Sequence, residues 1–175
     1  MAGGVDAVQV REKDLPDDEL TALVEQVWKA VQVRAGVLVN GRPRVADCLG
    51  VGLHLPADAP APDERDWPLW GRSVHSPEEA QHQAKESPDY LLVGPVYATD
   101  SKPGHPGGGL SLVEETARAA SPIPVLAIGG IDATNAGVVM AAGAAGVAVR
   151  GAILAASDPG RAARSILAAM QDVAV

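Results

Sequence analysis

Two short apolar runs, each closely followed by glycine, most constrain what this chain can fold into. Residues 125–128 and 147–149 are continuous β-rich runs without polar alternation, which is typical of parallel strands covered on both faces. A helical segment lies between them, for which Asp132 or Thr134 can provide the N-cap and Gly143 the stop. This order predicts two adjacent parallel strands with glycine turns at their carboxyl ends.

The same alternation of strands and helices runs along the whole chain. Apolar runs predict seven strands, over residues 5–11, 37–39, 51–55, 69–75, 89–97, 125–128 and 147–149. Helices are predicted between them, one of which opens with Ser76 as N-cap and Pro77 at its first position. Strict alternation indicates an α/β fold with a parallel sheet, and the spaced glycines of an open dinucleotide-binding sheet are missing. We therefore predict a TIM (β/α)8 barrel that lacks its first strand at the N-terminus.

The length, charge and cysteine content of the chain exclude several classes of protein. The 175 residues fit one domain over 1–175, and a net charge of -8 argues against binding to nucleic acid or to a membrane surface. The single cysteine, Cys48, excludes an intramolecular disulfide. Without an apolar run of membrane-spanning length or a leader peptide, we expect a cytoplasmic protein. Strand edges left open by a missing first strand would suit a homo-oligomer of undetermined subunit number.

Basic residues are scarce, yet several follow predicted strands. Five of the 14 Lys and Arg residues stand near strand ends: Arg11, Lys13, Arg42, Lys102 and Arg150. A cationic barrel mouth on an acidic protein is suited to small anions. Glycine lets backbone N–H groups approach a phosphate, so we predict a phosphate site at Gly129, Gly130, Arg150 and Gly151. The alternative is that these glycines only form turns. Residues 98–109, rich in Gly and Pro, are predicted to be a mobile lid.

Several ordered motifs resemble those of thiamine phosphate synthases. They read Gln9-Val-Arg-Glu-Lys13, Ser73-Val-His-Ser76, Gly94-Pro-Val-Tyr-Ala-Thr99, Lys102 and Ala127-Ile-Gly-Gly-Ile131. That family joins a pyrimidine diphosphate to a thiazole phosphate on a (β/α)8 barrel, with magnesium at the leaving diphosphate. The resemblance implies that eight residues surround the pyrimidine and the diphosphate: Gln9, Arg11, Lys13, Asn40, Ser73, Thr99, Ser101 and Lys102. It also implies that Gly130 and the backbone around Arg150 and Gly151 hold the thiazole phosphate.

Two acidic positions of the synthases, both magnesium ligands, differ in this chain. Gly41 stands where the family has Asp after Asn40, and Ala59 stands where a second Asp is expected, with Asp58 beside it. A hard cation needs several oxygen ligands placed together, so one lone acid is a poor replacement. We therefore predict no resident metal or cofactor, and Mg²⁺ only if the protein is a synthase.

The same departures resemble the paralogous TenI-type thiazole tautomerases, as do Asn40-Gly-Arg42 and Gly71-Arg-Ser-Val-His-Ser76. That group isomerises thiazole carboxylate phosphate by acid–base proton transfer and needs no metal. Our leading hypothesis is therefore a TenI-like tautomerase of thiamine biosynthesis, an isomerase acting on a small phosphorylated thiazole. Thiamine phosphate synthase, a transferase, is the first alternative. A non-catalytic, regulatory paralogue that binds thiazole phosphate is the second.

The tautomerase hypothesis requires a proton carrier, and the resemblance does not supply one because Pro95 stands where that group has His. His54, at the end of a predicted strand, is the first candidate, although a lone histidine in a strand is more often a core residue. His75 is interpreted as structural because its motif is shared with the synthases. His105 lies in the predicted lid, and Lys102 is better suited to binding an anion than to acting as a base.

Overall fold

The computed structural model describes residues 3–31, 34–62 and 66–172, and it divides into two compact units. The first unit is Val5–Arg72, and the second runs from Ser73 onward and includes Gly3 and Gly4. Each unit is an alternation of strands and helices, and each has its own apolar core. We predicted a single domain over residues 1–175, and whether the two units form one domain stays a prediction.

The first unit is built on parallel strands that follow one another in chain order. Its elements are β1 (Ala7–Val10), α1 (Asp17–Val31), β2 (Gly36–Asn40), α2 (Pro43–Leu49), β3 (Gly52–Leu55) and the first residues of β4 (Trp70–Val74). β1 pairs with β2, β2 with β3, and β3 with β4, all in parallel. The helix α1 buries Leu20, Val24 and Val31 along one face, and these side chains join Val39 and Leu53 in the core.

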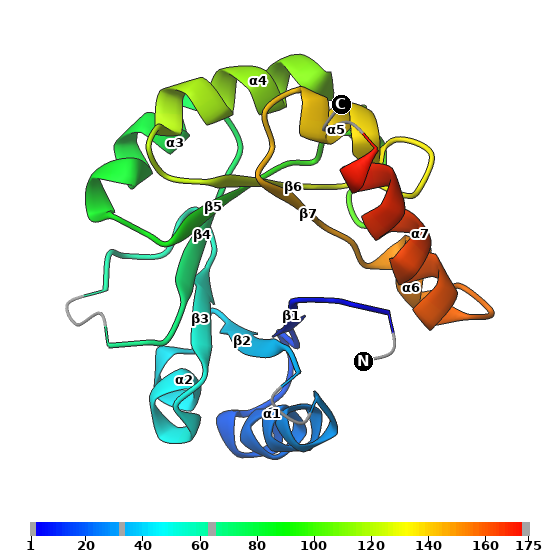
Figure 1. Cartoon of the computed structure of the whole chain (residues 1–175). Helices are drawn as coiled ribbons and strands as arrows, with labels where there is room; N and C mark the ends of the chain where they lie inside the picture. Colours follow the sequence, from blue (N-terminus) through cyan, green and yellow to red (C-terminus); the bar gives the residue numbers. More distant parts are fainter. Residues whose placement is uncertain (1–2, 32–33, 63–65, 173–175) are drawn as a thin grey trace. The chain divides into compact units, whose positions relative to one another are not determined.

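The second unit repeats the pattern with more helices. Its elements are α3 (Pro77–Gln83), the 3-10 turn η1 (Ala84–Glu86), β5 (Tyr90–Val93), α4 (Gly109–Ala120), β6 (Val125–Ile128), α5 (Ala136–Ala141), β7 (Gly146–Ala148), α6 (Gly151–Leu154) and α7 (Pro159–Gln171). β5, β6 and β7 are parallel neighbours. The helix α4 lies between α3 and α5 and contacts both (Figure 1).

Two helices of the second unit begin where their sequences place a cap. The Ser76 hydroxyl accepts a hydrogen bond from the Glu79 N–H at 3.2 Å, with Pro77 at the first position of α3, so that prediction is confirmed. Asp158 caps α7 in the same way, because its carboxylate accepts from the Arg161 N–H at 2.9 Å. Both caps satisfy N–H groups that a helix leaves unpaired at its start.

The predicted α/β alternation with seven strands is confirmed, whereas closure of these strands into a barrel that lacks its first strand stays a prediction. The described residues contain seven strands, which are parallel within each unit, where a (β/α)8 barrel has eight. Residues 3–6, which precede β1, do not form a strand. Gly3 instead lies against α7, so closely that a Cβ on it would stand 2.7 Å from the Ala163 Cβ. That approach requires glycine.

Several predicted boundaries also move. The strand predicted over 89–97 ends at Val93, because Pro95 has no N–H for a ladder. Asn135, rather than Asp132 or Thr134, stands at the N-cap position of α5, and Asp132 instead accepts a hydrogen bond from the Thr134 N–H. Within the described ranges, no helix is both long and apolar enough to cross a membrane. After the last strand, the sequence predicts a closing helix over residues 159–173, and α7 begins at Pro159 as this predicts, whereas position 173 lies outside the described residues.

Candidate functional site

The first unit brings two predicted site residues into contact. Gln9 lies on β1 and Asn40 ends the neighbouring β2, and the Asn40 Nδ2 donates a hydrogen bond to the Gln9 Oε1 at 3.3 Å. Arg11 and Lys13 follow β1 on the surface. The Lys13 carbonyl accepts a hydrogen bond from the Arg42 Nη2 at 3.0 Å, which ties the loop after β1 to the start of α2. Amides and cations therefore gather at the carboxyl ends of β1 and β2.

His54 lies on β3, beside Asn40 of β2, and is completely buried. Its burial, followed by the nearby positive charges of Arg11 and Arg72, lowers the pKa of His54 from 6.5 to about 4. The ring is therefore neutral at pH 7. Its assignment as a proton carrier stays a prediction, and full burial means that a substrate could reach it only if the surrounding side chains moved.

Arg72 is a buried cation that the sequence analysis did not single out. It lies on β4 with 1% exposure, and its guanidinium donates to the carbonyls of Ala57, Ala59 and Pro60 at 3.4, 2.7 and 3.1 Å. These bonds fix the segment after β3. The sequence did contain a signal for this role, because Arg72 stands alone as a charged residue within a predicted buried strand. A buried charge needs hydrogen-bond partners such as these carbonyls.

The family resemblance implies a magnesium site, and the side chains and carbonyls at the corresponding positions show whether this chain could bind that ion. Gly41 and Ala59 offer no side-chain oxygen, and Asp58 is exposed. The carbonyl oxygens nearest that position, those of Ala57 and Ala59, accept hydrogen bonds from Arg72. In the parts of the chain that the structure describes, no group of three or more His, Cys, Asp or Glu side chains could hold a metal. The donors at these positions do not fit Mg²⁺.

The glycine turn after β6 lies in the second unit. Gly129 and Gly130 have φ values of 107° and 64°, a region that favours glycine. A Cβ on Gly130 would lie 2.6 Å from the Ala98 carbonyl oxygen. The Asn135 side chain pins the turn, because its Nδ2 donates to the Gly130 carbonyl and its Oδ1 accepts from the Asp132 N–H, both at 2.9 Å. Packing therefore requires both glycines.

Arg150 and Gly151 follow β7, the strand that pairs with β6. The register places Ile128 beside Ala148, so the two predicted halves of the phosphate site leave neighbouring strands at the same edge. Both Arg150 and Gly151 are exposed, and a Cβ on Gly151 would meet nothing within 4 Å. Packing does not require glycine there, and the space above its backbone is open.

The loop 98–108 contains neither helix nor strand, as predicted for the lid, and its mobility stays a prediction. The Lys102 N–H donates to the Thr99 carbonyl at 3.0 Å, and the Ser101 N–H donates to the Thr99 hydroxyl at 3.4 Å. These bonds form a turn that presents three predicted site residues together. Ser73 precedes them on β4 and is half-buried.

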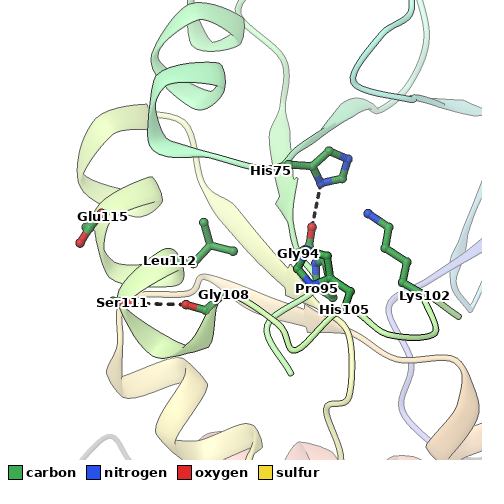
Figure 2. Close-up of a pocket in the computed structure, with 9 residues that line it drawn as sticks. All are labelled: His75, Gly94, Pro95, Lys102, His105, Gly108, Ser111, Leu112 and Glu115. Atoms are coloured by element: carbon green, nitrogen blue, oxygen red, sulfur yellow. Dashed lines mark hydrogen bonds between the residues drawn. The ribbon is translucent and has the colours of Figure 1, made fainter. Parts of the chain in front are cut away.

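A cavity of about 290 Å³ opens beside this loop, as Figure 2 shows. Lys102, His105, His75 and Glu115 are among its lining residues. The His105 Nδ1 accepts a hydrogen bond from a backbone N–H of the loop at 3.0 Å. The His75 Nδ1 lies 2.7 Å from the Gly94 carbonyl oxygen. The cavity therefore combines imidazole rings, an ammonium group and a carboxylate.

Polar and glycine-rich loops thus follow the carboxyl ends of parallel strands in both units, which is where α/β proteins of this architecture place their ligands. The sequence model of thiamine monophosphate synthase matches residues 1–153. The chain belongs to the thiamine monophosphate synthase family.

Individual relatives agree with that assignment. The chain is 42% identical over 150 residues to the thiamine-phosphate synthase of Thermus thermophilus, covering 82% of this chain and 72% of the relative. It is 40% identical over 152 residues to that of Thermobifida fusca, covering 82% and 70%. The structure of thiamine phosphate pyrophosphorylase from Pyrococcus furiosus superposes with a TM-score of 0.84 at 28% identity, over 99% of this chain and 87% of that one.

Proposed function

We propose that this protein is a thiamine phosphate synthase, a transferase that joins a pyrimidine diphosphate to a thiazole phosphate and releases diphosphate. The observation that carries the proposal is the 42% identity with the Thermus thermophilus synthase over 150 residues. That similarity favours the synthase over the tautomerase, which was the leading hypothesis from the sequence.

The strand ends of the first unit suit the pyrimidine diphosphate. The hydrogen-bonded amides of Gln9 and Asn40 can donate to and accept from the edge of an aminopyrimidine. Arg11 and Lys13 are exposed cations beside them. When the bond to the diphosphate breaks, the electron pair leaves with the diphosphate, so cations held nearby stabilise the developing charge.

The second unit has anion-binding groups of its own. The turn of Thr99, Ser101 and Lys102 offers two hydroxyls and an ammonium group to a phosphate group of the substrate. The backbone of Gly130 and Gly151, after neighbouring strands, suits the single phosphate of the thiazole. Arg150 would add a positive charge beside Gly151, and Ser73 a hydroxyl from β4.

A second candidate, the thiazole tautomerase, is favoured by one specific observation. Gly41 and Ala59 stand where a synthase would hold magnesium, and the donors there do not fit that ion. A tautomerase would use the same phosphate site and a proton carrier, for which His54 is the proposed residue. A regulatory paralogue that only binds thiazole phosphate would retain binding without turnover.

Paired assays on the purified protein distinguish these candidates. Coupling of the pyrimidine and the thiazole, measured as released diphosphate with and without excess Mg²⁺, supports the synthase. Conversion of the thiazole carboxylate phosphate without coupling supports the tautomerase. Binding of thiazole phosphate with neither activity supports the regulatory paralogue.

Lys102→Ala is the matching site variant. We expect it to lower kcat/KM for coupling by about tenfold to hundredfold, which is what the loss of a charge-assisted hydrogen bond to a phosphate group of the substrate would cause. Lys85→Ala, which removes an exposed lysine from η1 in the same unit, is the control and should retain the wild-type rate. Equal rates for both variants would remove Lys102 from the proposed site.

A further inference from the structure

His75, interpreted from the sequence as structural, occupies a position that its hydrogen bonds define closely. Its Nδ1 lies 2.7 Å from the Gly94 carbonyl oxygen, which can only accept, so Nδ1 carries the proton and donates it. In the neutral ring, Nε2 is then the nitrogen without a proton. Figure 2 shows Nδ1 directed at the Gly94 carbonyl and the other nitrogen turned away from it.

The backbone of His75 is held by the start of α3. The His75 N–H donates to the Glu79 Oε2 at 2.7 Å, and the Glu79 N–H donates to the Ser76 hydroxyl at 3.2 Å. This reciprocal arrangement is a variant of the capping box, in which the N-cap side chain and a glutamate three residues later exchange hydrogen bonds. The imidazole therefore projects from a fixed point.

The segment that His75 holds in turn supports the glycine turn. The Val96 N–H donates to the Ile128 carbonyl at 2.9 Å, and the Tyr97 N–H donates to the Gly129 carbonyl at 3.0 Å. Gly94 approaches the end of β6 so closely that a Cβ on it would lie 2.2 Å from the Ile128 carbonyl oxygen. Residues 94–97 thus back the proposed phosphate-binding turn.

The same segment also holds the end of the lid. The Gly108 N–H donates to the Pro95 carbonyl at 2.9 Å, and the Gly109 N–H donates to the Val96 carbonyl at 2.8 Å. Residues 94–97 are therefore hydrogen-bonded on one side to the glycine turn after β6 and on the other to the point where the lid joins α4. The Gly94 carbonyl, at the start of the segment, accepts from His75.

We propose that His75 is a positioning residue. By donating from Nδ1 to the Gly94 carbonyl, it fixes residues 94–97 and, through them, the glycine turn and the end of the lid. The identity of the ligand at that turn rests on the proposed function, but the positioning role does not. Proton transfer through the other ring nitrogen, Nε2, is the competing role that the test must separate.

Substitution of His75 by asparagine and by glutamine separates the roles of the two ring nitrogens. His75→Asn places an N–H donor close to where Nδ1 stands, whereas His75→Gln places one close to Nε2, and His75→Ala removes both. His82→Ala, which removes an exposed histidine from α3, is the matched control. Circular dichroism and thermal unfolding establish which variants fold.

The first readout is amide hydrogen exchange at Val96, Tyr97, Gly108 and Gly109, measured by NMR, which does not depend on activity. We expect exchange to rise about tenfold in His75→Ala and His75→Gln, as the loss of one hydrogen bond implies, and to stay near wild type in His75→Asn and His82→Ala. Unchanged exchange in His75→Ala would overturn the proposal.

The second readout is kinetic. We expect KM for thiazole phosphate to rise about tenfold in His75→Gln with a smaller change in kcat, and His75→Asn to restore it. A His75→Asn variant that loses kcat as severely as His75→Ala, with KM unchanged, would indicate proton transfer and overturn the positioning role. If the wild type has no coupling activity, the proposed function fails by itself, and thiazole phosphate binding by calorimetry replaces KM.

Discussion

The first unit buries two basic side chains, whereas the basic side chains that the structure describes in the second unit are exposed. Among the described residues, the buried polar or charged side chains are His54 and Arg72 in the first unit and the uncharged Thr116 in the second. Lys102 and His75 of the second unit are exposed and line an open cavity. The two units therefore use polar groups in different ways.

Burial decides what each group can do. A buried charge is costly unless it is fully hydrogen-bonded, so Arg72 is tied to three carbonyls and shapes the segment after β3. An exposed ammonium group such as Lys102 remains available to a ligand. We therefore expect substitutions of the buried residues in the first unit to change stability and its pH dependence. Substitutions at the cavity of the second unit should instead change ligand binding.

The largest expected effect on stability is that of Arg72→Met. Replacing the guanidinium leaves the carbonyls of Ala57, Ala59 and Pro60 without their donors, so we expect the free energy of unfolding to fall by about 3 kcal/mol or more. All three tryptophans, Trp28, Trp67 and Trp70, lie in the first unit, so tryptophan fluorescence during urea unfolding reports on it. Arg44→Met, an exposed arginine on α2, is the control and should change stability little. Equal effects would mean that burial does not distinguish the two arginines.

His54 should make the first unit sensitive to acid. The pKa of His54 is about 4 in the folded chain, whereas that of an ordinary histidine is 6.5, so between these values the unfolded chain binds a proton that the folded chain does not. Stability therefore falls as the pH drops through this window, by about 3 kcal/mol in total, and the loss is complete below pH 4.

Urea unfolding at pH 7 and pH 4 measures this dependence. His54→Gln has no titrating ring, so its loss of stability on acidification should be smaller than that of the wild type by about that amount. The exposed His82, replaced by Gln, is the control and should behave as the wild type does. Identical losses in the wild type and in His54→Gln would contradict the lowered pKa of His54.

The sequence predicted those features of the fold that depend on neighbouring residues. Apolar runs locate the strands, and Ser76 with Pro77 locates the start of α3. Gly129 and Gly130 are correctly placed at a turn after β6, where positive φ and close packing both require glycine. Such signals lie within a few positions of one another, so they can be read without tertiary structure.

Features that depend on distant contacts could not be predicted in this way. The carbonyls that bind Arg72 lie 12 to 15 positions earlier in the chain, and the carbonyl that binds His75 lies 19 positions later. The motif containing His75 indicated a structural role but not which nitrogen acts. His54 was selected because it lies near a strand end, and only packing shows that its side chain is wholly buried.

The smallest expected effect on stability compares two helix caps of the second unit. Ser76→Ala and Asp158→Ala each remove a side chain that accepts from the first turn of a helix, so each should lower stability by about 1 kcal/mol. The two differ in what lies beside them. Ser76 helps to hold Glu79, which accepts from the His75 N–H, whereas Asp158 stands at the start of α7.

Hydrogen exchange separates the two caps where stability does not. If the start of α3 fixes His75, Ser76→Ala should speed amide exchange at Val96 and Gly108 about threefold, a partial form of the His75→Ala effect, and Asp158→Ala should leave those amides unchanged. The tryptophan fluorescence of the folded protein, which reports on the first unit, should be the same in both variants as in the wild type. Equal exchange in both variants would restrict the role of Ser76 to capping α3 and would place the support of residues 94–97 in the imidazole of His75 alone.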